Sequence, residues 1–265
     1  MKVHLFLVAL LLSTTTCKQV KDKPTSFGEK LLQQGKYREA IKELKFAMLN
    51  DSVEHNLPFL LGEAYLQEEN YDSALVFFQK SKELGRNDAE LFYKLGVTKY
   101  ELDKLDCSDF LVALSLDDQR QEIWYYSGLC LMEVANFKKA FEFFSRSISL
   151  DMAHHQSYQQ RSLSSYAVSN YSLALDDINK AISLNDSLDY FYQKASILNR
   201  MEAFEEVLLA CDKALEIDAS NIRTLRLKAQ TMINMGMRER GCALIKKIMS
   251  IDPGQDLSSY SEICL

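Results

Sequence analysis

The sequence predicts an all-helical solenoid in which about seven similar units stack in a row. Small residues recur at one interval, because Gly28, Gly62 and Gly96 are 34 residues apart and Gly128 follows after 32. Apolar residues make up 47% of the 265 residues, which is enough for a continuous core. The chain has only three prolines, each placed where a helix of this register begins or has just ended.

Each unit carries two apolar faces at helical spacing separated by a turn, which predicts a pair of packed helices. A small residue where the first helix crosses the second lets the two backbones approach closely, and a larger side chain would overpack the crossing. The third unit is two residues shorter around its inner turn, near residues 102–106. The predicted units are residues 21–54, 55–88, 89–120, 121–154, 155–187, 188–221 and 222–255.

This pattern resembles the tetratricopeptide repeat, in which a bulky residue, Leu-Gly and Tyr mark the first helix and Ala, an aromatic residue and Ala mark the second. The fourth unit carries it most clearly, with Trp124, Gly128, Leu131, Phe137, Ala140, Phe144 and Ser147. The resemblance covers residues 27–255. It implies a right-handed α-α superhelix that binds a protein or peptide on its inner, concave face.

In the family that this chain resembles, ligands contact fixed positions of the first helix of each unit. Tyrosine and apolar residues at these positions are typical of peptide recognition. The alternative is that some tyrosines pack on the next unit and close the groove. Carboxylates are concentrated in the first units (the front) and arginines in the last units (the rear). The electrostatic field of this charge distribution would orient an extended ligand. The predicted groove residues are Phe59, Glu63, Tyr93, Val97, Tyr100, Glu101, Tyr125, Leu129, Met132, Tyr166, Tyr192, Arg200, Arg223 and Arg226.

One subgroup of the family grips a C-terminal carboxylate with lysine, asparagine and arginine on its first three units. The same positions here hold Thr25, Glu29, Phe59, Glu63, Tyr93 and Val97. The clamp of that subgroup is therefore absent, which argues against a chaperone-tail adaptor.

The N-terminal residues 1–16 predict an export signal, because Lys2 precedes an apolar run of about ten residues and bilayer-spanning helices need roughly twenty. Cys17 closes the segment, so it resembles a bacterial lipoprotein signal, which implies cleavage before Cys17 and lipidation of that residue. Residues 17–26 are predicted to be a lipidated tether to a bacterial membrane, with the outer membrane favoured.

The lipoprotein pattern is imperfect, because Thr14 and Thr16 stand where the family prefers Leu and a smaller residue. Simple secretion into the periplasm or medium remains the alternative. The tail, residues 256–265, has apolar residues three apart and is interpreted as either a capping helix or a frayed terminus.

Composition and motifs argue against several classes of function. A net charge of −6 gives no basic field for nucleic acid. The sequence has no Gly-rich phosphate loop, GxSxG or HExxH, so we predict no enzyme and no cofactor. The six cysteines include no CxxC pair, which argues against a metal site. Cys130 and Cys211 are expected to be buried as small apolar residues.

The histidines His55, His154 and His155 lie at unit boundaries and are interpreted as parts of solvated turns rather than as metal ligands. The adjacent carboxylates Asp176 and Asp177 are interpreted as a solvated face.

Three Asp-Ser pairs are similar to the O-glycan acceptor pattern of exported Bacteroidota proteins, and they place candidate serines at Ser52, Ser73 and Ser187. Helix capping explains the same residues equally simply.

Together these features predict a non-enzymatic scaffold of the bacterial envelope that binds a protein or peptide in its groove. The chain resembles lipidated repeat proteins that assist outer-membrane protein or pilus assembly. Two alternatives remain, a glycan-binding accessory lipoprotein and a regulatory subunit of an envelope enzyme.

Overall fold

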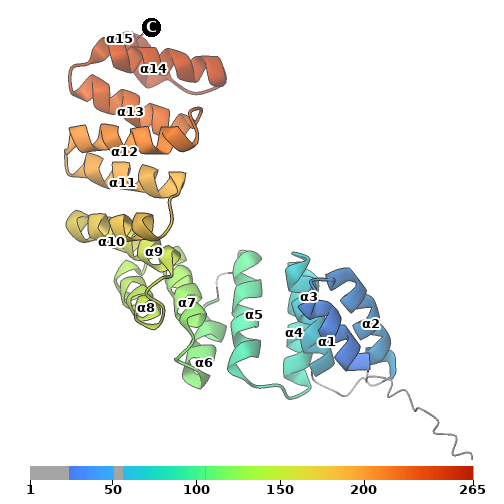
Figure 1. Ribbon diagram of the computed structural model, residues 1–265. Coiled ribbons are helices and arrows are strands. Elements are labelled where there is room, and N and C mark those ends of the chain that lie inside the picture. Colours follow the sequence, from blue (N-terminus) through green and yellow to red (C-terminus); the bar gives the residue numbers. More distant parts are fainter. Residues whose placement is uncertain (1–23, 51–55, 105, 265) are drawn as a thin grey trace, which may run out of the picture.

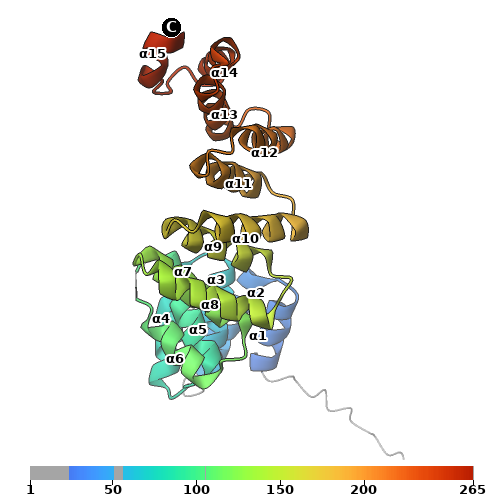
Figure 2. The same cartoon turned by 90° about the vertical axis from the view of Figure 1, so that its left-hand side faces the viewer.

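The computed structural model describes residues 24–50, 56–104 and 106–264, and these residues form helices with no β-strand among them. The helices pack in consecutive pairs, and each pair packs on the next, so the predicted all-α solenoid is confirmed. Figures 1 and 2 show the helices α1 to α5 in one arm and α9 to α15 in a second arm, with α6 to α8 at the bend between them.

Each predicted unit contains one helix pair. The pairs are α1 (Pro24–Gln33) with α2 (Tyr37–Asn50), α3 (Asn56–Gln67) with α4 (Tyr71–Glu83), α5 (Ala89–Glu101) with α6 (Ser108–Leu116), α7 (Gln121–Glu133) with α8 (Phe137–Leu150), α9 (His155–Ala167) with α10 (Tyr171–Leu184), α11 (Leu188–Arg200) with α12 (Phe204–Ile217), and α13 (Ile222–Asn234) with α14 (Arg238–Ile251).

The first helix begins at Pro24, inside the segment predicted to be a tether, because proline is well suited to the first position of a helix. The predicted signal segment, Cys17, Ser52 and His55 lie outside the described residues.

Close approach at the helix crossings explains the recurring small residues. A Cβ atom added to Gly62 would lie 2.6 Å from the Phe78 ring, and one added to Gly128 would lie 2.6 Å from Phe144. The last three units instead place Ser162, Ala195 and Ala229 at this position. Their second helices carry Ile178, Cys211 and Ile245 in place of the larger ring. In these three units a larger residue in the first helix is thus matched by a residue smaller than phenylalanine in the second.

The turn between the two helices of each unit has a common backbone geometry. One residue in each turn lies in the left-handed region, with φ between 53° and 80°. These residues are Gly35, Glu69, Asp103, Ala135, Ser169, Glu202 and Gly236. The third unit keeps this turn, so its two missing residues fall after it and shorten the start of α6.

A disulfide lies where the shortened third unit meets the fourth. Helix α6 has 9 residues, whereas the second helices of the other units have 13 or 14. It packs less extensively on the following unit than the other second helices do. Cys107, at the start of α6, bonds to Cys130 of α7, with the two Cα atoms 5.9 Å apart. This bond links the two units directly at the bend.

The burial expected for Cys130 and Cys211 is confirmed, but the role predicted for Cys130 is wrong because it forms a disulfide. The two bonded cysteines are 23 residues apart and belong to different units, so no short spacing motif marks them. Cys211 keeps a free thiol inside the sixth unit.

The C-terminal tail caps the last unit through the 3₁₀ helix η1 (Ser258–Tyr260) and α15 (Ser261–Cys264). Leu257 and Tyr260 are buried in one cluster with Leu225 and Ile245. A second disulfide, Cys242–Cys264, joins the tail to α14. In this position the tail covers the apolar face that a terminal repeat would otherwise expose.

Asp177 corrects the interpretation of Asp176 and Asp177 as one solvated face. Asp176 is exposed, but Asp177 is 3% exposed and accepts two hydrogen bonds from the Arg161 guanidinium, at 2.8 and 2.6 Å. A carboxylate buried between helices requires such a partner because desolvation of an unpaired charge is costly.

Cysteine labelling provides a direct check on this arrangement. We expect that a thiol-alkylating reagent leaves all five cysteines of the described residues unmodified in the native, unreduced protein. Burial raises the pKa of the Cys211 thiol to about 12, so little reactive thiolate forms. Mass spectrometry should show Cys211 labelled only after unfolding, and the other four only after reduction. Labelling of Cys107 or Cys242 without reductant would contradict the disulfides.

Candidate functional site

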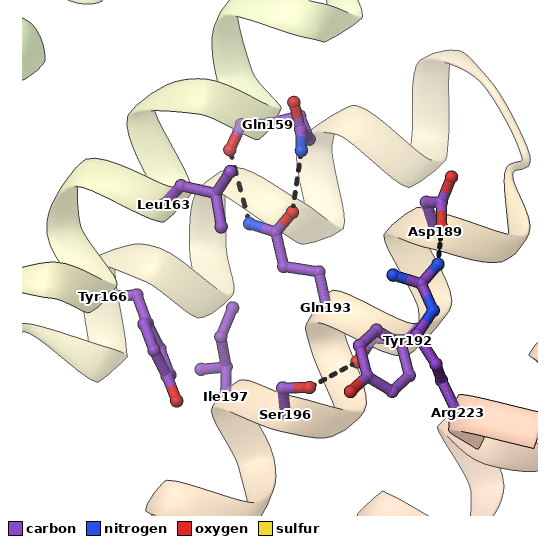
Figure 3. A pocket seen from close by; sticks show the side chains of 9 residues that line it. All are labelled: Gln159, Leu163, Tyr166, Asp189, Tyr192, Gln193, Ser196, Ile197 and Arg223. Carbon is purple, nitrogen blue, oxygen red and sulfur yellow. Dashed lines mark hydrogen bonds and ion pairs between the residues drawn. The ribbon is translucent and has the colours of Figure 1, made fainter. Parts of the chain in front are cut away.

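A cleft of about 520 Å³ lies on the face formed by the first helices of the last three units. Figure 3 shows Leu163, Tyr166 and Ile197 on one side of it, with Tyr192 and Arg223 on the other. The cleft receives residues from α9, α11 and α13 because these helices lie side by side in the stack. Three of the predicted groove residues, Tyr166, Tyr192 and Arg223, are therefore brought together.

The floor of this cleft is a network of amide groups. Gln193, which is 8% exposed, donates to the Ser162 hydroxyl at 2.9 Å and to the Gln159 carbonyl at 3.3 Å. The Gln159 side chain donates in turn to the Gln193 amide oxygen at 3.1 Å. These bonds join α9 to α11 and satisfy the buried polar groups, which makes the floor rigid.

A second cleft of about 380 Å³ adjoins the first, because Tyr192 and Arg223 line both. Its other walls include Arg226 of α13 and Tyr260 of the C-terminal cap. We call the two clefts together the rear groove. Its lining residues are Gln159, Leu163, Tyr166, Asp189, Tyr192, Gln193, Ser196, Ile197, Ile222, Arg223, Arg226, Leu227, Gln230, Gln255 and Tyr260.

Two of the three predicted arginines, Arg223 and Arg226, line this groove, and Arg200 lies beside it. Arg200 donates to the Tyr166 hydroxyl at 3.0 Å. Arg223 pairs with Asp189 at 2.8 Å, and its guanidinium lies 5.1 Å from the centre of the Tyr192 ring. Arg226 is the most enclosed of the three and donates to residues of the cap. The arrangement gives the rear groove cationic donors beside aromatic faces.

Two predicted groove residues are corrections, because their side chains are buried. Phe59 is 4% exposed and packs on Phe78, with the Arg86 guanidinium 3.4 Å from its ring centre. Val97 is 8% exposed and packs with Phe110. Neither residue presents a free surface, because neighbouring helices of the stack cover these positions.

Tyr126 organises the tyrosines at the centre of the chain. The rings of Tyr93 and Tyr100, from the third unit, meet it edge-on, and so does the ring of Tyr125. Burial raises the pKa of both Tyr93 and Tyr125, so both remain neutral phenols at ordinary pH. These contacts correspond to the alternative in which tyrosines pack on the neighbouring unit, and Tyr126 itself was not among the predicted residues.

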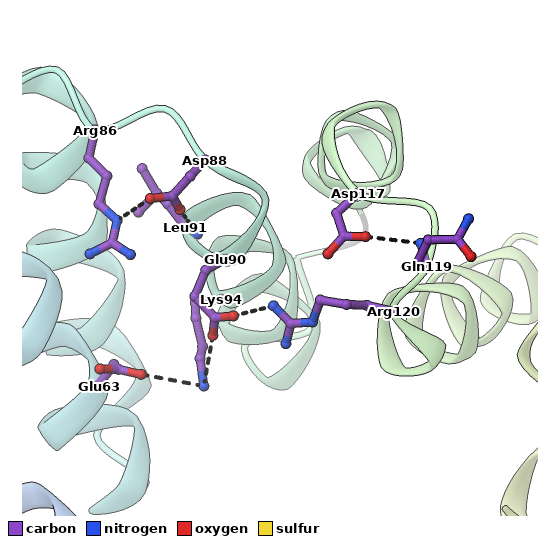
Figure 4. Close-up of polar contacts among 9 residues, drawn as sticks. All are labelled: Glu63, Arg86, Asp88, Glu90, Leu91, Lys94, Asp117, Gln119 and Arg120. Atoms are coloured by element: carbon purple, nitrogen blue, oxygen red, sulfur yellow. Dashed lines mark hydrogen bonds and ion pairs between the residues drawn. The ribbon is translucent and has the colours of Figure 1, made fainter. Parts of the chain in front are cut away.

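Carboxylates of the second and third units form more ion pairs than the sequence suggests. The Lys94 Nζ atom lies 3.7 Å from Oε1 of Glu63 and 3.5 Å from Oε1 of Glu90, and Arg120 also pairs with Glu90 (Figure 4). Burial raises the pKa of Glu63, and Lys94 opposes that shift. Lys94 and Arg120, both of the third unit, therefore balance part of the negative charge predicted for the front units.

The remaining predicted positions do not line the rear groove. Leu129 and Met132 are partly buried, and the Ser164 hydroxyl lies 3.1 Å from the Met132 sulfur. Glu101 is exposed at the end of α5. These residues lie on first helices, as predicted, but the two clefts are formed by the first helices of later units.

His154 and His155, at the boundary between the fourth and fifth units, are structural, which corrects their interpretation as solvated turn residues. His154 caps α9 by accepting a hydrogen bond from the Ser157 backbone N–H. Its ring packs edge-on against the Tyr125 ring, with the two ring centres 4.9 Å apart. The Nδ1 atom of His155 lies 2.6 Å from the Tyr190 hydroxyl. Each ring is therefore partly buried and has a defined partner.

Protonation of His154 should make stability depend on pH. Burial lowers the pKa of His154 below its ordinary value of 6.5, so the unfolded chain binds a proton more readily than the folded one. The contribution is fully present above pH 6.5 and is lost as the pH falls from there toward the lowered pKa. In urea unfolding from pH 7.5 to 5, the His154→Asn variant, which keeps a capping residue, should lose less stability than the wild type. Parallel profiles would contradict this assignment.

Within the described ranges, no group of three or more histidine, cysteine and carboxylate side chains is placed to hold a metal ion. None of the helices in this part of the chain is both long and apolar enough to cross a bilayer.

Asp189, Gln193, Ser196 and Tyr260 line the rear groove although they were not predicted from the sequence. Helical spacing offers a signal for the first three, because they lie three or four residues from Tyr192 or from one another and so lie on the side of α11 that lines the cleft. Tyr260 has no such signal, because its place depends on how the tail folds back over α13 and α14.

The comparisons with known proteins agree with this architecture. Residues 59–88 match the tetratricopeptide repeat family model. No curated protein sequence matches the chain. The crystal structure of YrrB, described as a TPR protein with an unusual peptide-binding site, is 22% identical with a TM-score of 0.59, covering 64% of this chain and 90% of that one.

Two further crystal structures align over most of the chain. The C-terminal part of a TPR repeat-containing protein from Cytophaga hutchinsonii is 15% identical with a TM-score of 0.70, and the alignment covers 88% of this chain and 96% of that one. A tetratricopeptide repeat protein from Parabacteroides merdae is 16% identical with a TM-score of 0.64, over 91% and 96%. The chain therefore has the tetratricopeptide repeat fold that the sequence predicted.

Proposed function

From its tetratricopeptide repeat fold, we infer that this chain is a non-enzymatic scaffold of the bacterial envelope whose rear groove binds a segment of a partner protein. The observation that carries the proposal is the pair of adjoining clefts on the first-helix face. YrrB, which has the same fold, is described as a peptide-binding protein.

The chemistry of the rear groove suits a peptide. Tyr192 and Arg223 stand at the junction of the two clefts, and tyrosine and arginine are the residue types that contribute most to protein interfaces. Leu163 and the Tyr166 ring, which are both partly exposed, offer an apolar patch for a side chain of the ligand. The Gln193 amide is already satisfied by internal bonds, so the groove is organised before a ligand arrives.

Two features support export of the protein from the cytoplasm. The N-terminal segment resembles an export signal that ends at Cys17. The disulfides Cys107–Cys130 and Cys242–Cys264 are of the kind that persists in oxidising compartments such as the periplasm or cell surface. The two features are independent, because the bonded cysteines lie far from the signal.

Lipidation of Cys17 is tested by fractionation. We expect the Cys17→Ala variant to leave the membrane fraction, because several acyl chains on one cysteine provide durable attachment and the variant has none. Cells expressing the wild type or the variant are separated into membrane and soluble fractions and probed for the protein. Cys211→Ala is the matched control and should stay with the membrane. Equal membrane retention of Cys17→Ala would rule out the lipid anchor.

Site-specific photo-crosslinking in cells tests the binding groove. A photoreactive residue at Ser196 or Gln230, which line the two clefts, should capture a discrete protein partner that mass spectrometry can identify. The control position is Asp176, which is exposed on a second helix. Capture from Asp176 and not from the groove positions would place the partner on another surface and contradict the proposal.

A further inference from the structure

We propose that the rear groove, completed by the C-terminal cap, selects acidic peptide segments. The proposal rests on the function inferred above and specifies the chemistry of the ligand. Three features support it: the positive charge of the groove arginines, an unpaired donor on Arg226, and the contribution of the cap to the groove wall.

Among the described residues, neither Arg223 nor Arg226 donates a hydrogen bond to a carboxylate that is shielded from solvent. Arg200, beside the groove, donates to a tyrosine hydroxyl. Arg226 donates to an amide oxygen and a backbone carbonyl, and the Asp256 carboxylate interacts with it only electrostatically. Arg223 pairs with Asp189, but both side chains are more than 60% exposed. An exposed pair of this kind contributes little and exchanges readily for a ligand carboxylate.

The front of the molecule differs in this respect. Lys94 lies between Glu63 and Glu90, and Arg120 also pairs with Glu90, so cations there already face carboxylates (Figure 4). In a chain with a net charge of −6, the rear groove is therefore a local cationic site. Complementary charge of this kind directs an acidic segment to the rear units rather than to the front.

Arg226 has an unused hydrogen-bond donor inside this site. One of its terminal nitrogens, Nη2, donates to the Gln255 side chain at 2.9 Å and to the Asp256 carbonyl at 3.4 Å. Its Nε–H is buried and has no hydrogen-bond partner. A buried donor without an acceptor carries a desolvation cost, and a carboxylate is the acceptor that matches a guanidinium edge best.

The cap is part of the groove and not only a cover for the core. Gln255 and Tyr260 both line the second cleft, and Gln255 also orients Arg226. The Cys242–Cys264 disulfide fastens the end of the cap to α14. Holding the cap in place therefore holds one wall of the proposed acidic-peptide site.

The test uses two labelled ten-residue peptides, one alternating glutamate with leucine and one alternating lysine with leucine. Fluorescence anisotropy should show the mature protein binding the acidic peptide at least tenfold more tightly, with weaker binding as salt is raised, because screening acts on charge contacts. Equal affinity for the two peptides would overturn the proposal. So would binding of the acidic peptide that salt does not weaken.

Substitutions locate the site. Arg223→Gln and Arg226→Gln should each weaken binding of the acidic peptide by about tenfold, the usual effect of losing a hydrogen bond to a charged group. Arg240→Gln, on the exposed surface of α14, is the matched control and should bind as the wild type does. Equal losses from Arg240→Gln and Arg223→Gln would overturn the assignment. Arg223 is exposed, so its substitution tests the groove even if Arg226→Gln disturbs the cap.

The role of the cap is tested with the Cys242→Ser/Cys264→Ser variant, which should bind the acidic peptide more weakly while Cys107→Ser/Cys130→Ser retains affinity. Unchanged affinity in the first variant would remove the cap from the site. The crosslinking experiment separates the two proposals. If a partner is captured from Gln230 but the protein shows no preference for acidic peptides, the proposed charge selectivity is wrong and the binding groove stands. If a partner is captured only from Asp176, the rear groove is not the binding site.

Discussion

Replacing Arg161 with methionine is expected to lower the free energy of unfolding by about 3–5 kcal/mol, because the change leaves a buried carboxylate without its partner. The Asp177 side chain is only 5% exposed, and both of its oxygens accept hydrogen bonds from Arg161. The guanidinium also donates to the Ser145 hydroxyl at 3.1 Å. This pair thus connects three helices of the fourth and fifth units.

Urea unfolding of four proteins checks this expectation: the wild type, Arg161→Met, Asp177→Leu, and the double variant. The double variant should recover most of the loss, since an apolar pair can replace a buried ion pair at little cost. Breaking the exposed Arg223–Asp189 pair provides the control, with an expected loss of at most about 1 kcal/mol. A loss for Arg161→Met no larger than that of the control would show that the buried pair is not structural.

Replacing Gly128 with alanine is expected to cost about 1–3 kcal/mol, because the crossing of α7 and α8 has no room for a methyl group. The added Cβ would lie 2.6 Å from a carbon of the Phe144 ring, well inside van der Waals contact. Phe144 is itself fully buried, so its ring cannot turn away into solvent. Either the ring or the helix must move.

The other units suggest how to relieve this clash. Alanine at Ala229 stands opposite Ile245 in the seventh unit, and serine at Ser162 stands opposite Ile178 in the fifth. Adding Phe144→Ile to Gly128→Ala should therefore give a smaller loss than the sum of the two single changes, with a favourable coupling of about 0.5–3 kcal/mol. Thermal and urea unfolding of all four proteins measure that coupling. Additive losses would show that side-chain volume at the crossing is not what the recurring glycine controls.

The repeating parts of this fold were accessible from the sequence because they rest on local periodicity. Gly128 and Phe144 lie at helical positions that recur in each unit, so their burial and crossing follow from spacing alone. The groove was predicted less completely. Tyr166, Tyr192, Arg223 and Arg226 line the clefts, whereas Phe59 and Val97 are buried. A side chain at a given repeat position is exposed in one unit and buried in another, because neighbouring helices cover that position to different extents.

Sequence alone determined that the chain forms stacked helix pairs, since the hydrophobic effect acts on a pattern that each unit repeats. Only the tertiary structure decided which distant residues meet. It joined Cys107 to Cys130 across the shortened third unit, gathered the central tyrosines around Tyr126, and brought Tyr260 of the cap beside Arg226. These contacts depend on how successive units tilt and on where the tail folds. Both depend on how side chains pack between units, which the spacing within one unit does not specify.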